Sequence, residues 1–207
     1  MSPQRRQKSR ETIRRTPERS NGRSTVAAIF EATARILQRH GRAGLNTNLI
    51  AEQAGVSIGA LYGYFPNKES IVLAMARREL DQIKDRVNAA LTDQASDEPD
   101  PVRRAIRALL AGYSARGRAR RILMETLFAH GGSEDMARPI FEVADTLIAN
   151  AARVFPRGVA PSRIGLFVLT RAVDGVIRTA TYEGVDFLAS REFEDEIVRL
   201  VYGYLGA

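Results

Sequence analysis

The stretch TNLIAEQAGVSIGALYGYF, residues 47–65, decides the fold of the N-terminal part of this chain. Thr47 stands where a helix N-cap is expected, and a small apolar face follows, formed by Ile50, Ala51 and Ala54. Gly55 then provides a left-handed stop, and Ser57 is in place to cap a second helix. Two short helices joined by a tight glycine turn are typical of a helix-turn-helix.

The second helix carries two glycines, Gly59 and Gly63, although each glycine inside a helix costs about 1 kcal/mol relative to alanine. Both glycines fall opposite Leu61 and Phe65, which we expect to pack inward. The outward face is then almost bare backbone, rimmed by Tyr62, Tyr64 and Lys68. A bare face permits close approach to a major groove, and hydroxyls and a cation suit phosphate oxygens. The alternative is a frayed helix whose glycines have no role.

Nearly every other periodic segment also has a helical period. In residues 24–40 the expected inward stripe is Val26, Ile29, Phe30, Ala34 and Leu37. A long helix over 68–91 should bury Ile71, Met75, Leu80, Ile83 and Val87. Further helices are expected at 101–115, 119–130, 134–155, 162–183 and 190–205. No strand pattern occurs, so we predict an all-α fold of about nine helices.

We expect three parts along the chain. They are a basic flexible arm at 1–21, a three-helix DNA-binding bundle at 22–82 with the helix-turn-helix at 46–65, and a larger C-terminal helical domain at 83–207. Of the net charge of +7, residues 1–23 carry +6, so the body is nearly neutral. A basic arm fits nucleic acid or an anionic membrane surface, or it is a solvated segment that aids solubility.

Composition narrows the setting of the protein. The chain has no cysteine, so it has neither disulfides nor a thiolate metal site, and we expect it in the cytoplasm. The basic N-terminus lacks the apolar core of a secretory signal, and no run of 18 apolar residues predicts a membrane span.

The stretch TNLIAEQAGVSIGALYGYFPNKESI resembles the DNA-binding signature of TetR/AcrR-type transcriptional regulators, and the resemblance covers about residues 22–80. The matching positions are Thr47, Ile50, Ala51, Ala54 to Ser57, Gly59, Leu61, Tyr62, Tyr64, Phe65, Lys68 and Glu69. The resemblance implies that phosphates are held by Thr47, Tyr62, Tyr64 and Lys68. It implies that base edges are faced by Asn48, Ile58, Gly59 and Ala60, with Ser57 beside them.

Two positions depart from the family pattern. Ala60 stands where members often have threonine, and Gly63 leaves another contact position without a side chain. Base reading would then rest on Asn48 and on contact of Ile58 or Ala60 with thymine methyl groups, although Ile58 is equally suited to half-burial against the core. We also hypothesise that the arm reaches an adjacent minor groove through Arg14, Arg15, Arg19 and Arg23.

The C-terminal helices are expected to supply a dimer interface and a pocket. In the TetR family the last two helices pair with their twofold mates, which implies an interface of Leu166, Leu169, Val173, Ile177, Ile197, Val201 and Tyr204; the alternative is that these residues form intramolecular core. The family also binds small molecules between C-terminal helices. Pocket candidates, or else plain core, are Tyr113, Met124, Phe128, Met136, Phe141 and Phe167. Asp174 and Arg178 form an i, i+4 pair suited to the dimer surface, a ligand or solvent.

No catalytic or metal-binding pattern accompanies these features. The two histidines, His40 and His130, end helices, and no nucleophile elbow or P-loop occurs. We therefore expect no enzyme, no cofactor and no metal. The predicted function is a homodimeric, sequence-specific transcriptional regulator, a repressor that a small-molecule effector releases from a palindromic operator in double-stranded DNA, with no membrane partner. The alternatives are a sequence-neutral DNA-coating protein driven by the arm and an all-helical enzyme.

Overall fold

The computed structural model describes residues 20–114, 117–130, 133–155 and 161–205. Within these residues the chain forms ten α-helices, two short 3-10 helices and no strand, which confirms the all-α prediction. The elements are α1 (Ser20–His40), η1 (Arg42–Gly44), α2 (Thr47–Ala54), α3 (Ile58–Tyr64), α4 (Lys68–Thr92), α5 (Pro101–Ser114), α6 (Gly117–His130), α7 (Ser133–Ala149), α8 (Ala151–Val154), α9 (Arg163–Glu183), η2 (Asp186–Ala189) and α10 (Arg191–Leu205). None of the described helices combines the length and apolar character that a membrane span requires.

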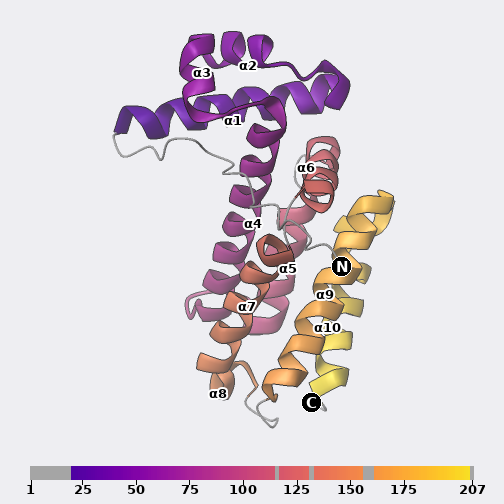
Figure 1. Ribbon diagram of the computed structural model, residues 1–207. Coiled ribbons are helices and arrows are strands. Elements are labelled where there is room, and N and C mark those ends of the chain that lie inside the picture. Colours follow the sequence, from indigo (N-terminus) through magenta and orange to yellow (C-terminus); the bar gives the residue numbers. More distant parts are fainter. Residues whose placement is uncertain (1–19, 115–116, 131–132, 156–160, 206–207) are drawn as a thin grey trace, which may run out of the picture.

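The N-terminal bundle lies at one end of the molecule. Helix α1 crosses the top of α4, and α2 and α3 cover its upper side (Figure 1). All five side chains predicted to point inward from α1 are buried, as are Leu61 of α3 and Phe65, the residue that ends α3. The rings of Phe30 and Phe65 lie 5.9 Å apart between centroids. The apolar stripes of short helices are thus held by a shared core rather than by helix propensity.

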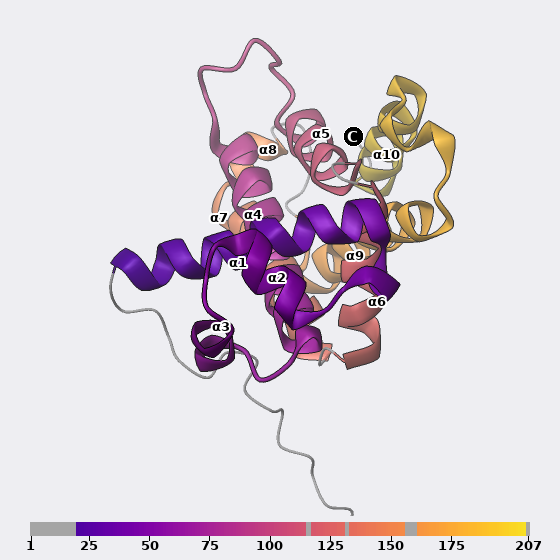
Figure 2. The same cartoon turned by 90° about the horizontal axis from the view of Figure 1, so that it is seen from above.

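Helix α4 connects the bundle to the rest of the molecule. It begins with a capping box, in which the Asn67 side chain accepts from Ser70 N at 2.8 Å while the Ser70 hydroxyl accepts from Asn67 N. Its five predicted inward residues are all buried. Further along, α4 packs against α5, α6 and α7, and α1 also contacts α6 (Figures 1 and 2).

One predicted helix is divided in the structure. The segment expected as a single helix over 134–155 ends as α7 at Ala149 and resumes as α8 at Ala151. Asn150 lies between them outside the helical region, with φ −114° and ψ 18°. Its side-chain amide donates to the Thr146 carbonyl at 2.9 Å, a local hydrogen bond of the kind that competes with helix continuation.

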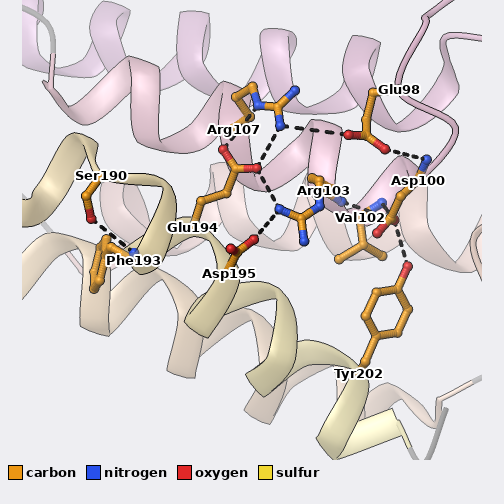
Figure 3. A network of polar contacts seen from close by, with 10 residues as sticks. All are labelled: Glu98, Asp100, Val102, Arg103, Arg107, Ser190, Phe193, Glu194, Asp195 and Tyr202. Carbon is orange, nitrogen blue, oxygen red and sulfur yellow. Dashed lines mark hydrogen bonds and ion pairs between the residues drawn. The ribbon is translucent and has the colours of Figure 1, made fainter.

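A polar clamp fastens α10 to α5 (Figure 3). Glu194 of α10 accepts from Arg103 at 3.0 Å and from Arg107 at 2.8 and 3.1 Å. These two arginines hold the pKa of the Glu194 carboxyl below its usual range. One turn from the end of α10, the Tyr202 hydroxyl donates to Asp100 at 2.6 Å. The clamp fixes the C-terminal helix against the body of the same chain.

Candidate nucleic-acid interface

The turn between α2 and α3 has the geometry that its sequence predicts. Gly55 adopts a left-handed conformation with φ 66° and closes α2. Ser57 caps α3 by accepting from Ala60 N at 3.1 Å. The turn and the cap together fix the angle at which α3 leaves the bundle.

The N-cap of α2 differs from the prediction. Asn46 is the cap, and its side chain accepts from Leu49 N at 2.8 Å. Thr47 is the first residue of the helix, so its hydroxyl is not used in capping and lies 3.1 Å from the Tyr62 hydroxyl of α3. The prediction of Thr47 as cap was wrong because two adjacent residues could both cap, and only the backbone direction chose Asn46. The observed contact instead joins two predicted phosphate-binding hydroxyls.

The outward face of α3 is open. A Cβ added at Gly59 or Gly63 would meet no atom of the described residues within 4 Å. Leu61 and Phe65, on the opposite side, are fully buried. Packing inside the chain therefore does not require either glycine. The face exposes backbone over the length of the helix.

Exposed side chains flank this open face. Ile58 is 39% exposed and Tyr62 is 44% exposed, so Ile58 can contact a ligand surface instead of the core. Asn48 of α2 is also exposed, whereas Ala60 is half-buried. Hydroxyl, amide and apolar groups thus surround the exposed backbone on the outward face of α3.

Two predicted phosphate contacts have further roles in the fold. Tyr64 is half-buried and packs against the hydrophobic core. The Lys68 ammonium donates to the Leu45 carbonyl at 3.0 Å, which ties the start of α4 to the loop before α2. Because an ammonium has three hydrogens, this bond leaves Lys68 able to contact a phosphate as well. Sequence spacing gave no sign of the Leu45 contact, because the partner is a main-chain oxygen 23 residues away.

The arm prediction is tested only at its end. Helix α1 begins at Ser20, so Arg23, which the sequence placed just before the first helix, is an exposed residue of the first turn of α1. Arg14, Arg15 and Arg19 lie outside the described residues.

A cavity lies between the C-terminal helices. Its volume is about 130 Å³, and its walls come from α4, α5, α7, α9 and α10 together with Phe155. Of the predicted pocket residues, Tyr113 lines it. Phe141 and Phe167 instead lie half-exposed on the surface, with the Arg171 guanidinium 5.2 and 5.3 Å from their ring centroids. The side chains of Met124, Phe128 and Met136 lie outside the description.

The predicted dimer residues lie mostly in the core of the chain. Leu166, Leu169, Val173, Ile177, Ile197 and Val201 are all buried within one protomer, and only Tyr204 is exposed. The prediction selected the most apolar stripe, but that stripe covers α5 and α7 of the same chain. A second, outward stripe lies at the surface and combines apolar side chains with two glycines. It consists of Ile164, Val168, Gly175 and Val176 on α9 and of Leu200, Gly203 and Tyr204 on α10.

Comparison with known proteins identifies the N-terminal unit. The family model described as bacterial regulatory proteins, tetR family, matches residues 29–75, which span the helix-turn-helix. The HTH-type transcriptional regulator BetI of Stenotrophomonas maltophilia is 24% identical over 86% of this chain and 89% of its own length. The N-terminal unit of the chain is therefore a TetR-type DNA-binding domain.

Two further comparisons, one of sequence and one of structure, also find transcriptional regulators. The HTH-type transcriptional regulator TtgR of Pseudomonas putida is 36% identical, over 44% of this chain and 40% of its own length. A TetR family transcription regulator from Marinobacter aquaeolei superposes with a TM-score of 0.59 at 22% identity, over 89% of this chain and 97% of that one. The whole chain therefore has the fold of that regulator. The tetR-family helix-turn-helix at residues 29–75 is what makes it a DNA-binding transcriptional regulator.

Outside the helix-turn-helix, the described residues bear on the metal and cavity expectations of the sequence. Over the described residues no group of three or more histidine, aspartate or glutamate side chains is arranged to hold a metal ion. Two polar groups of the cavity wall, the Tyr113 hydroxyl and the Asp174 carboxylate, are hydrogen-bonded to each other. The sequence left the Asp174–Arg178 pair open between the dimer surface, a ligand and solvent, and the structure places Asp174 in the cavity wall.

Proposed function

We propose that this TetR-family chain acts as a homodimeric repressor that reads a palindromic operator with the open face of α3. The observation that carries the proposal is that a Cβ at Gly59 or Gly63 would contact none of the residues that the structure describes. Glycine lowers helix propensity at both positions, and no packing among the described residues requires it. The two glycines therefore suit a helix that another surface approaches closely. The major groove is wide enough to take such a helix.

We assign the flanking groups by their chemistry. Thr47, Tyr62, Tyr64 and Lys68 contact phosphates, and these contacts position α3 without reading sequence. Base edges are left to Asn48, Ser57, Ile58 and Ala60, of which the Asn48 amide is suited to bidentate contact with adenine. Arg23, exposed on the first turn of α1, adds a cation beside this surface.

We assign the dimer interface to the outward stripe of α9 and α10, as defined above. Ile164, Val168 and Val176 are exposed apolar side chains, and Gly175 and Gly203 have no neighbour within 4 Å of a built Cβ. Small residues let two helix pairs approach closely. A twofold dimer also matches the symmetry of a palindrome, whose half-sites lie about 34 Å apart.

The effector site in this proposal is the C-terminal cavity, and we set the boundary between the two domains near residue 82. Helix α4 lines the cavity and begins at the helix-turn-helix, so a change in its direction moves α3. Helix α6 adds a second link, because Arg42 donates to the Thr126 hydroxyl at 2.8 Å and Ala119 N donates to the Gln38 side chain at 3.3 Å. The effector lowers DNA affinity by its own preference between the two conformations.

The test is to mix the full-length protein with sheared genomic DNA at physiological salt and to sequence the retained fragments. A short palindrome in a few fragments is the expected result. Asn48→Ala should narrow the difference in binding free energy between that operator and random DNA by about 1–3 kcal/mol. Gln94→Ala, which removes an exposed amide in the loop just after α4, is the matched control.

Two outcomes would contradict the proposal. Diffuse recovery of fragments would favour the alternative of a sequence-neutral DNA-coating protein. Equal losses by Asn48→Ala on operator and random DNA would move Asn48 from base reading to phosphate contact.

A further inference from the structure

Among the described residues, the walls of the C-terminal cavity are apolar except for four side chains. Apolar side chains line it along α4 from Leu80 to Leu91, a distance of about 16 Å at the helical rise. The polar contributions come from Tyr113 of α5, from Thr170 and Asp174 one turn apart on α9, and from Lys84 of α4. An occupant must therefore be mainly apolar and elongated, with its polar group at one position.

The polar groups on α5 and α9 offer acceptors and no free hydrogen. The Tyr113 hydroxyl donates its hydrogen to Asp174 at 3.1 Å. The Thr170 hydroxyl donates its hydrogen to the Leu166 carbonyl at 2.7 Å. Both oxygens keep lone pairs, and an ionised carboxylate accepts only. A ligand that contacts this group of side chains must supply the hydrogen itself.

The Lys84 ammonium does not offset this excess of hydrogen-bond acceptors in the cavity wall. It donates to Glu142 of α7 at 2.6 Å and contacts Asp85 at 3.2 Å. These two carboxylates raise the pKa of Lys84, with the Glu142 hydrogen bond as the larger cause. The positive charge nearest the cavity is therefore already paired with two negative charges.

The Asp174 carboxylate is short of positive partners. Its side chain is 14% exposed, and its ion pair with Arg178 is 3.6 Å long, which is too long for a hydrogen bond. Arg178 does not line the cavity, whereas Asp174 does. Burial raises the pKa of Asp174, and Arg178, Tyr113 and Arg171 offset this only in part. A cation inside the cavity would supply the missing compensation.

We infer that the cavity binds an elongated apolar amine whose protonated nitrogen donates to Asp174, with Tyr113 and Thr170 as further acceptors. This inference rests on the proposed function, because it names the chemical class of the effector. A fatty carboxylate of the same length would place an acceptor against acceptors and one negative charge beside another. The same site therefore discriminates against acids.

The test uses three probes with one ten-carbon chain: decan-1-amine, decan-1-ol and decanoate. Each is titrated into the full-length protein by calorimetry at pH 7, below the concentration at which the probe forms micelles. The amine should bind most tightly and decanoate most weakly. Asp174→Asn should weaken amine binding by about 10- to 100-fold, since a charged hydrogen bond is lost, and should change decanol binding little.

Matched variants separate a lost contact from a collapsed cavity. Asp145→Asn removes an exposed carboxylate on α7 and should leave all three affinities unchanged. Tyr113→Phe removes one acceptor but frees a lone pair of Asp174, so it should change amine binding far less than Asp174→Asn does. Melting by circular dichroism checks that each variant folds.

Three results would overturn the inference: decanoate binding as tightly as the amine, no binding by any probe, or a loss in Tyr113→Phe as large as in Asp174→Asn. DNA binding is measured separately without probe. A chain that binds its operator but takes no amine loses this inference alone. A chain that takes the amine through Asp174 but binds no specific DNA loses the proposed function and keeps the site.

Discussion

Replacing Gly59 and Gly63 by alanine should stabilise the protein and weaken its binding to DNA. A built Cβ at either position meets nothing within 4 Å in the protein, so alanine fits without displacing any group. Neither glycine has a positive φ, so both backbones suit alanine. Any loss of DNA affinity must then come from the surface that approaches α3.

The two effects have separate magnitudes. Each substitution should add roughly 0.5–1 kcal/mol to the free energy of unfolding, with the lower value expected because both positions lie close to an end of the seven-residue helix α3. For a chain of this size, each kcal/mol raises Tm by about 2–4 °C. A methyl group forced into a close interface costs about 1–3 kcal/mol of binding, which is roughly 5- to 150-fold in Kd.

The assay pairs thermal melting with fluorescence-anisotropy binding to the selected operator. Gly117→Ala is the matched control, because its Cβ also meets nothing within 4 Å but it lies on α6. It should not change DNA affinity. If Gly59→Ala and Gly63→Ala raise Tm and leave operator affinity unchanged, the open face of α3 is not the surface that contacts DNA.

Three further predictions concern the fold and assembly. Asn67→Ala removes the cap of α4 and should lower stability by about 1 kcal/mol in urea unfolding, whereas Asn67→Asp, which keeps the acceptor, should not. Because the folded pKa of Glu194 is depressed, its clamp contributes fully above the unfolded value of about 4.3 and is lost as pH falls through the folded pKa. Glu194→Gln should therefore lower stability at pH 7 by roughly 1–3 kcal/mol and reduce the acid-induced loss below pH 4.3; an unchanged acid limb would contradict this. Val176→Arg places a charge on the outward stripe of α9 and should yield monomers in light scattering. Thr179→Arg, about one helical turn further along α9, tests how far the interface extends. If the Val176→Arg variant remains a dimer, this face is not the interface.

The sequence alone determined the elements that depend on local chemistry. The left-handed Gly55, the Ser57 cap and the inward stripes of α1, α3 and α4 follow from backbone sterics and helical period. The open face of α3 was also readable, because the two glycines fall opposite Leu61 and Phe65 on any α-helix. These features need no distant partner, so a single stretch of chain specifies them.

Other assignments depended on which surfaces meet. Asn46 rather than Thr47 caps α2 because the approach of the chain from η1 sets which side chain reaches the free N–H groups. The most apolar stripe of α9 belongs to the core of its own protomer, because α5 and α7 pack against it. Asp174 reads as one half of a solvated pair until the hydroxyl of Tyr113, 61 residues away, is placed beside it.

The sequence thus determined an all-α chain with a DNA-reading helix-turn-helix, while only the tertiary structure decided which apolar face stays free and which carboxylate lines the cavity. The physical reason is range. Capping, turns and amphipathic period act over one or two helical turns, whereas burial and desolvation are set by helices far apart in the sequence.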